Sequence, residues 1–117
     1  MHARNHLEAL GKVKATADNL KSALEGETFE IDEMYPVYLS DAQLQGEKEA
    51  ERSHHYALEA EKIHAVMYKN AIEAALAGKD ITLAEISICP VCGYTVEGDI
   101  PDFCPVCGAK KSVFKTF

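Results

Sequence analysis

The four cysteines of the chain lie in two pairs near its C-terminus, and each pair belongs to the same five-residue sequence, CPVCG. The pairs are Cys89 with Cys92 and Cys104 with Cys107. Two tight turns of this kind can place four thiolates in a tetrahedron, which is the geometry of iron–sulfur and zinc sites. Two disulfides are the alternative, but the spacing favours metal in a reducing compartment. The ligand type alone leaves both iron and zinc open.

A second candidate site combines carboxylates with a histidine. Glu61 and His64 have i, i+3 spacing, which puts both side chains on one face of a helix. Glu30 and Glu33 have the same spacing on the preceding helical segment. The face that carries Glu61 is otherwise apolar, and a carboxylate is costly to bury there unless it is paired or bound to metal. The pattern indicates a carboxylate-bridged di-metal site in a helical bundle, with a solvated charge pair as the alternative.

Hydrophobic periodicity predicts the helices that carry these side chains. Residues 1–14 are typical of the end of a longer helix. Residues 16–45 form a second helix, which Pro36 should kink. The clearest helix covers residues 47–76, because its apolar positions recur over many turns and no glycine or proline interrupts it.

The character of the sequence changes after this long helix. Short β-like stretches and then proline, glycine and cysteine follow from residue 80. We therefore expect a helical metal-binding domain over residues 1–79 and a small cysteine domain over residues 80–117. Gly46 and Gly78 are the expected stops of the two long helices.

Charge and hydropathy exclude several classes of function. The chain of 117 residues has a net charge of −7, which argues against binding to nucleic acid or to anionic membranes. Its 47% hydrophobic content argues against wholesale disorder. No apolar run has the length of a membrane span, and the first residues lack the apolar core of a signal peptide. We therefore expect a cytoplasmic protein.

Three segments together resemble the rubrerythrins: GETFEIDEMYPVY at 26–38, EAEKIHAVMY at 59–68 and the paired CPVCG sequences. The resemblance covers essentially the whole chain. Rubrerythrins are non-haem iron peroxidases that join a ferritin-like four-helix bundle with a di-iron site to a C-terminal rubredoxin-like domain. The resemblance implies a mainly α fold with a small rubredoxin-like β domain, a di-iron carboxylate site and a mononuclear iron site with four cysteine ligands. Zinc is a possible substitute at the cysteines.

The resemblance also implies roles for individual residues. Glu30, Glu33, Glu61 and His64 match di-iron ligands, and His2 matches a histidine that can ligate one iron in the reduced state. The four cysteines match the rubredoxin iron ligands. The implied reaction reduces hydrogen peroxide to water. Its electrons would pass through the cysteine-bound iron from an external donor, such as rubredoxin or an NAD(P)H-dependent reductase.

The sequence departs from the family pattern at its start. The family has a further first helix with a ligand glutamate, and a glutamate three residues before the histidine that His2 matches. Both positions would lie before Met1, so one copy cannot complete the four-helix site. We expect a twofold dimer that closes the bundle, each chain giving Glu30, Glu61 and His64. A separate N-terminal segment is the alternative, and a natural short form, a cleaved product and a split protein all fit.

Two other functions remain open from the sequence. The first is an electron carrier in which only the cysteine site is active. The second is a structural zinc-ribbon module that acts through protein interaction.

Overall fold

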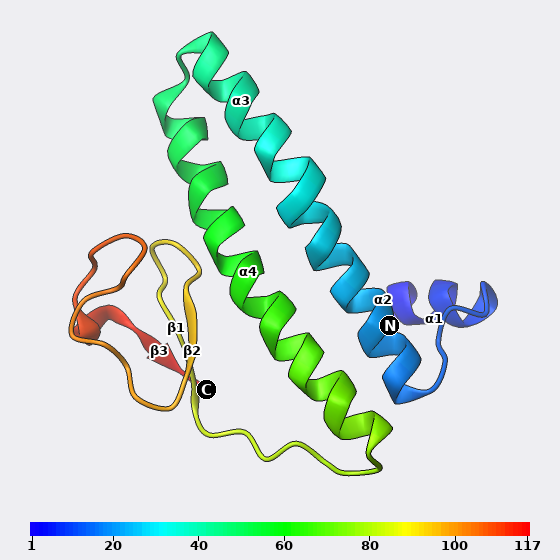
Figure 1. The fold of residues 1–117 in the computed structure, drawn as a ribbon. Coiled ribbons are helices and arrows are strands. Elements are labelled where there is room, and N and C mark those ends of the chain that lie inside the picture. The colour runs from blue at the N-terminus through cyan, green and yellow to red at the C-terminus, as the bar shows by residue number, and fades with distance from the viewer.

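A computed structural model describes residues 1–117 as a long helical hairpin with a small three-stranded domain beside it (Figure 1). This arrangement confirms the expected mainly α fold with a small β domain. The helical elements are α1 (His2–Ala9), α2 (Thr16–Phe29), the π-helical turn η1 (Glu30–Met34), α3 (Tyr35–Gln45) and α4 (Lys48–Leu76).

The elements α2, η1 and α3 form one continuous rod that runs antiparallel to α4 (Figure 1). Pro36 lies in the first turn of α3, and inside this continuous rod its missing N–H and its ring disturb the helical hydrogen bonds. The expected interruption takes the form of the wide turn η1 directly before this proline. Such π-helical turns inside α-helices are frequent at functional sites. Gly46 ends the rod with a φ of 73°, as expected, and the tight connection to α4 makes the two rods antiparallel neighbours.

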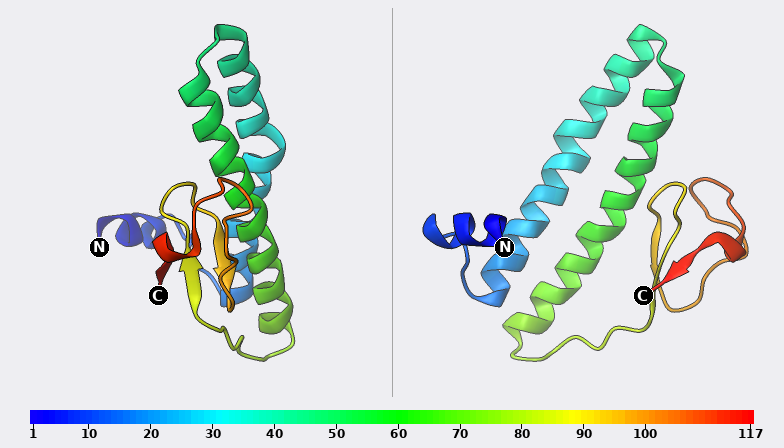
Figure 2. Two further views of the ribbon diagram at one scale, coloured as in Figure 1. Left: turned by 90° about the vertical axis from the view of Figure 1, so that its left-hand side faces the viewer. Right: turned by 180° about the vertical axis from the view of Figure 1, so that it is seen from behind.

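The uninterrupted helix α4 confirms the expected helix over residues 47–76 almost to the residue. It ends before Gly78, whose φ of 66° is the left-handed conformation expected there. In contrast, α1 stops at Ala9, short of the expected residue 14, and all its residues are exposed. It projects sideways from the hairpin, next to the first turns of α2 (Figure 2). No helix combines the length and the apolarity that crossing a bilayer requires.

The helical hairpin buries little of its own apolar surface. Only Ala42, Ala60 and Ile72 are buried within it. Large apolar side chains stay exposed on both rods, including Phe29, Val37, Leu44, Val66 and Leu76. Two helices bury only the stripes that face each other, so the remaining apolar surface needs a further layer.

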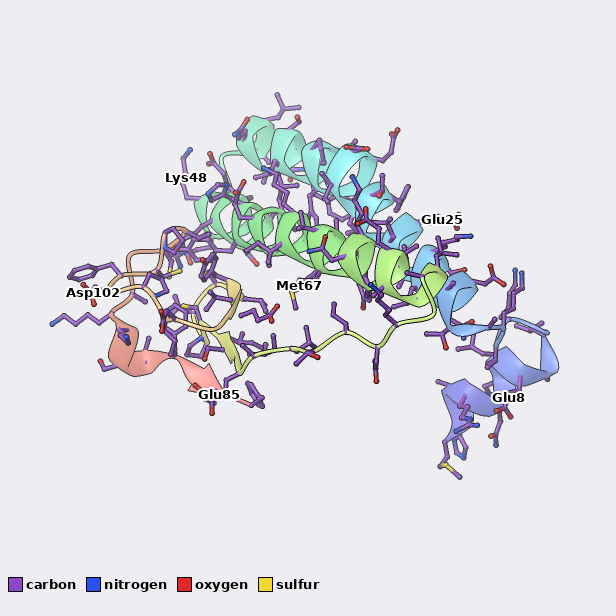
Figure 3. The ribbon with its side chains drawn as sticks, turned by 60° about the horizontal axis from the view of Figure 1, so that its bottom comes forward. Glu8, Glu25, Lys48, Met67, Glu85 and Asp102 are labelled. Carbon is purple, nitrogen blue, oxygen red and sulfur yellow. The ribbon has the colours of Figure 1, made fainter.

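The C-terminal part is a small antiparallel sheet. Its strands are β1 (Ile86–Ile88), β2 (Thr95–Glu97) and β3 (Lys115–Thr116), in the order β2-β1-β3, with a 3-10 turn at Lys111–Val113. Residues 77–85, which have no helix or strand, connect α4 to β1 (Figure 3). The sheet stands beside α4 on the side away from the other rod (Figure 2). The division of the chain at residue 79 stays a prediction.

Candidate metal centres

The two CPVCG sequences fold into turns with matching backbone hydrogen bonds. The N–H of Gly93 donates to the carbonyl of Cys89, and that of Gly108 to the carbonyl of Cys104, both at 2.9 Å. Both glycines have positive φ, 82° at Gly93 and 73° at Gly108, which side chains with a Cβ rarely adopt. The repeated sequence therefore gives a repeated structure, with the thiols of the two turns facing each other.

The distances between thiols fit a single metal ion. Cys89 Sγ lies 3.6 Å from Cys107 Sγ, and Cys92 Sγ lies 3.4 Å from Cys104 Sγ. All four sulfurs lie within 4.8 Å of one another, and all four cysteines are free. A tetrahedral ion with bonds to sulfur of about 2.3 Å holds its ligands just under 4 Å apart, roughly the spacing seen here. The geometry fits a mononuclear iron site with four thiolate ligands and does not fit disulfides.

The surroundings of the thiols shift their pKa values in opposite directions. Burial raises the pKa of Cys92, although the backbone N–H of Tyr94 donates to its sulfur. Burial also acts to raise the pKa of Cys104, but hydrogen bonds from the backbone N–H groups of Cys107 and Val106 outweigh it and the net shift is downward. N–H groups that point at sulfur stabilise its anionic form, as in other metal–thiolate sites.

The second cluster lies between α2 and α4 and consists of Glu27, Glu61 and His64. Glu61 Oε2 lies 2.6 Å from His64 Nδ1, and Glu27 Oε1 lies 4.0 Å from the same nitrogen. The carboxylate side chains are only 16% and 17% exposed. One ligand atom from each residue lies within 4.8 Å of the others. Two carboxylates and one imidazole are suitable ligands for iron.

Electrostatics show that this cluster is short of positive charge. Burial raises the pKa of Glu27 to about 7, and the hydrogen bond and charge of Glu61 add to the shift. The charge of His64 opposes the shift, and that of Glu30 adds to it. Buried carboxylates that repel one another are stabilised by a proton or by a cation. The donor set therefore fits a metal ion on charge as well as on distance.

Only some of the expected ligands lie together in the structure. It brings Glu61 and His64 together, as their spacing predicts. Glu30 is half-buried and close enough to act on the pKa of Glu27, but it is not among the three clustered groups. Glu33 is exposed on the outer side of the rod, in a hollow that Asp32 and Pro36 also line. His2 is exposed on α1 and does not join the cluster.

Sequence reasoning missed Glu27, although a signal was present. The half-buried stripe of the rod passes through Leu20, Leu24, Ile31 and Met34, and Glu27 fills the gap in this stripe. A carboxylate in an apolar stripe is the argument that identified Glu61. Glu33 lies six residues from Glu27, which is not a whole number of helical turns, so it faces elsewhere.

The two clusters meet along one side of α4. Ala60 lies against Gly93, the residue directly after Cys92. His64 Nε2 lies 3.2 Å from the hydroxyl of Thr95 at the start of β2. A cavity along this contact is lined by residues of both parts, among them Tyr56, Glu61, Val91 and Cys92. The helical cluster is therefore in direct contact with the segment that follows a cysteine ligand.

These features define a class of protein: a ferritin-like helical unit with a carboxylate–histidine cluster, joined to a rubredoxin-like unit with four cysteine ligands. Family comparison agrees with both parts. The family model Rubrerythrin matches residues 1–72, and the model for the rubrerythrin rubredoxin-like domain matches residues 88–115. The chain belongs to the rubrerythrin family. It is a rubrerythrin-type iron protein, and the family suggests an oxidoreductase.

Individual relatives extend this comparison. Rubrerythrin-2 of Clostridium acetobutylicum is 47% identical over 131 residues, which cover 100% of this chain and 71% of that protein. Nigerythrin of Nitratidesulfovibrio vulgaris is 33% identical over 99 residues, covering 85% of this chain and 48% of the relative. A solved structure described as nigerythrin in its fully reduced, all-ferrous state has a TM-score of 0.78 at 30% identity, covering 90% of this chain and 50% of that one. The chain thus spans about half the length of nigerythrin.

Proposed function

We propose that the chain acts as a rubrerythrin-type non-haem iron peroxidase. One hydrogen peroxide takes up two electrons and two protons and gives two molecules of water. An external donor such as rubredoxin or an NAD(P)H-dependent reductase supplies the electrons, and the four-cysteine site relays them. The observation that carries this proposal is the direct contact of the two clusters through Gly93 and Ala60 and through Thr95 and His64.

The residues of the chain have separate tasks in this proposal. The four cysteines would hold one iron, and Glu27, Glu61 and His64 would hold iron in the helical cluster. Iron supplies one-electron ferrous–ferric chemistry at both places. Tyr35 lies near the helical cluster, where burial and then the charges of Glu61 and Glu30 raise its pKa. Its hydroxyl therefore keeps its proton and remains a hydrogen-bond donor beside the carboxylates.

A second copy of the chain would complete the helical site. Ferritin-like di-iron bundles take a glutamate from each of two helices and a Glu-x-x-His pair from each of the other two. This hairpin supplies half of that set, namely Glu27 from α2 and the pair Glu61 and His64 from α4. A twofold axis supplies the other half and covers the apolar side chains that the hairpin leaves exposed. The outcome would be a homodimer with a shared di-iron site.

One observation favours a second candidate function, an electron carrier without peroxide chemistry. The four-cysteine site has its full set of ligands within one chain, whereas the helical cluster has only three. Iron content separates the two candidates. A peroxidase dimer requires about two iron ions per chain, one at the cysteines and half of a shared pair. An electron carrier requires one, and a structural zinc ribbon would hold zinc alone.

Reaction with peroxide is the decisive experiment. The anaerobically reduced protein is mixed in a stopped-flow instrument either with hydrogen peroxide or with dioxygen. We expect hydrogen peroxide to oxidise it faster than dioxygen does. Glu61→Ala should abolish the fast phase and keep the red colour of the oxidised cysteine site. Glu59→Ala is the matched control, because Glu59 pairs with Lys62 instead and is not in the cluster. An unchanged fast phase in Glu61→Ala would refute the peroxidase assignment of this cluster.

A further inference from the structure

A cavity of about 290 Å³ opens directly on the helical cluster. Residues of both the helical hairpin and the sheet line it, namely Glu27, His64, Met67, Tyr68, Ile88 and Thr95. A water molecule takes up about 30 Å³ in the liquid and hydrogen peroxide is only slightly larger, so the cavity has room for peroxide. The cavity therefore gives the proposed substrate a place beside two of the proposed iron ligands, Glu27 and His64.

One side chain of this cavity, that of Met67, reacts readily with peroxide. Met67 follows His64 by three residues, so the two side chains leave neighbouring positions on α4. Figure 3 shows the Met67 side chain on the side of α4 that faces the sheet. It is half-buried, and its thioether is the group among the lining side chains that peroxide converts directly to an oxidised product.

The step between peroxide and a thioether is balanced without a metal ion or a further reactant. A lone pair of the sulfur attacks one peroxide oxygen, so that a sulfur–oxygen bond forms and the oxygen–oxygen bond breaks. The second oxygen leaves as hydroxide and takes up the proton that the first oxygen releases. Sulfur loses two electrons and peroxide gains them, and the products are methionine sulfoxide and one water.

We propose that Met67 is the site at which peroxide modifies this chain, and that its sulfoxide closes the cavity and stops the peroxide reaction at the helical cluster. The sulfoxide is polar and larger than the thioether. The side chain of Ile88 offers it no hydrogen bond, so the new oxygen turns into the cavity and occupies the space that peroxide needs. The inference rests on the proposed peroxidase function and adds a limit to it, because excess peroxide switches the site off.

The first test measures oxidation in the full chain with zinc in the cysteine site and no iron. After treatment with hydrogen peroxide, peptide mass spectrometry measures the gain of one oxygen atom at each methionine. Met34 is the internal reference, because it is half-buried like Met67 but does not line the cavity. We expect Met67 to be oxidised well before Met34 in the folded chain, and both at similar rates in denaturant. Similar rates in the folded chain would overturn the inference.

The second test measures the consequence for the reaction in the iron-loaded protein. Samples are treated with excess peroxide, reduced again under anaerobic conditions and mixed with peroxide in a stopped-flow instrument. The wild type should lose its fast phase in proportion to the fraction of Met67 sulfoxide. Met67→Leu has a similar volume without the sulfur, so it should keep the fast phase of its own untreated sample.

Met34→Leu is the matched control, and treatment should reduce its fast phase as it does in the wild type. If Met67→Leu loses its fast phase to the same extent as the wild type, oxidation elsewhere stops the reaction and the inference is wrong.

The two measurements separate this inference from the proposed function. If the untreated, reduced protein has no fast phase with peroxide, the proposed peroxidase function fails. The mass measurement uses the wild-type chain without iron, so it still decides whether peroxide reaches Met67 through the cavity. That measurement also does not depend on whether a variant folds.

Discussion

Gly93 lies so close to Ala60 that a Cβ added to the glycine would stand 3.6 Å from the Cβ of the alanine. Ala60 is 5% exposed, so a larger side chain there would press against the segment at Gly93. We expect Ala60→Leu to push the four-cysteine unit away from α4, at a cost of about 1–3 kcal/mol in stability. Electron transfer from the cysteine site to the helical cluster should slow, while the visible spectrum of the cysteine site stays unchanged.

The control for this variant is Asn70→Leu, which adds the same side chain at an exposed position of α4. Single-turnover oxidation of the reduced protein by peroxide measures both variants. Equal rates in Ala60→Leu and the wild type would contradict transfer across this contact.

Substitutions of Glu27 and of Glu33 should differ in their effect on iron binding. Glu27 is one of the three clustered groups, and Glu33 is exposed on the outer side of the rod. We expect Glu27→Ala to weaken ferrous iron binding at the helical site by more than about 100-fold, because the loss of an outer partner alone commonly costs about 10- to 100-fold. Glu33→Ala should bind like the wild type. Calorimetric titration under anaerobic conditions compares them, and the reverse order of affinities would restore Glu33 as the ligand.

The difference between these two glutamates shows what the sequence can predict. The helix α4 and both cysteine turns depend on local patterns, namely apolar periodicity and a repeated CPVCG, and both were predicted. The spacing of Glu61 and His64 is local as well. The contact between Thr95 and His64 joins distant parts of the chain, and no local pattern encodes the docking that creates it. The turn η1 was also beyond prediction, because Pro36 signals an interruption but not its form.

Stability should depend on pH through Glu27 in the metal-free protein. Burial, with Glu61 nearby, raises the pKa of Glu27 from 4.5 to about 7. A carboxyl whose pKa is higher in the folded state stabilises the fold at low pH and loses that contribution as the pH rises through the folded value. The wild type should therefore lose stability between pH 4.5 and about pH 7.

Glu27→Gln should lose less stability over the same range, because the amide does not ionise. Denaturant unfolding at a series of pH values gives the two curves. Glu25→Gln, at an exposed position of the same helix, is the control and should follow the wild type. Parallel curves for Glu27→Gln and the wild type would show that the carboxyl is not desolvated.

Removal of the metal from the cysteine site should unfold the C-terminal sheet selectively. The buried apolar residues of that part are Cys89, Cys92 and Cys104, so little but the metal–thiolate bonds holds it together. We expect strong chelators to collapse the NMR signals of residues 86–117 into the narrow range of an unfolded chain, with α4 still helical by circular dichroism. A sheet that keeps its signals without metal would contradict this.

Sedimentation tests the proposed dimer. We expect the pure chain to sediment as a dimer and ferrous iron to strengthen the association, because ligands from both copies would bind the shared pair. His64→Ala should remove the iron dependence but leave any association through the apolar side chains. A stable monomer that binds no metal beyond the cysteine site would rule out the twofold site.

The connection at residues 77–85 joins the two candidate centres covalently. A short flexible tether holds its two ends at an effective concentration on the order of millimolar, regardless of how dilute the molecule is. In the proposed function, exchange of electrons between the four-cysteine unit and the helical cluster would then be first order in the chain. Low abundance would therefore act on the assembly of the dimer and on the encounter with the external donor, and not on this step within an assembled molecule.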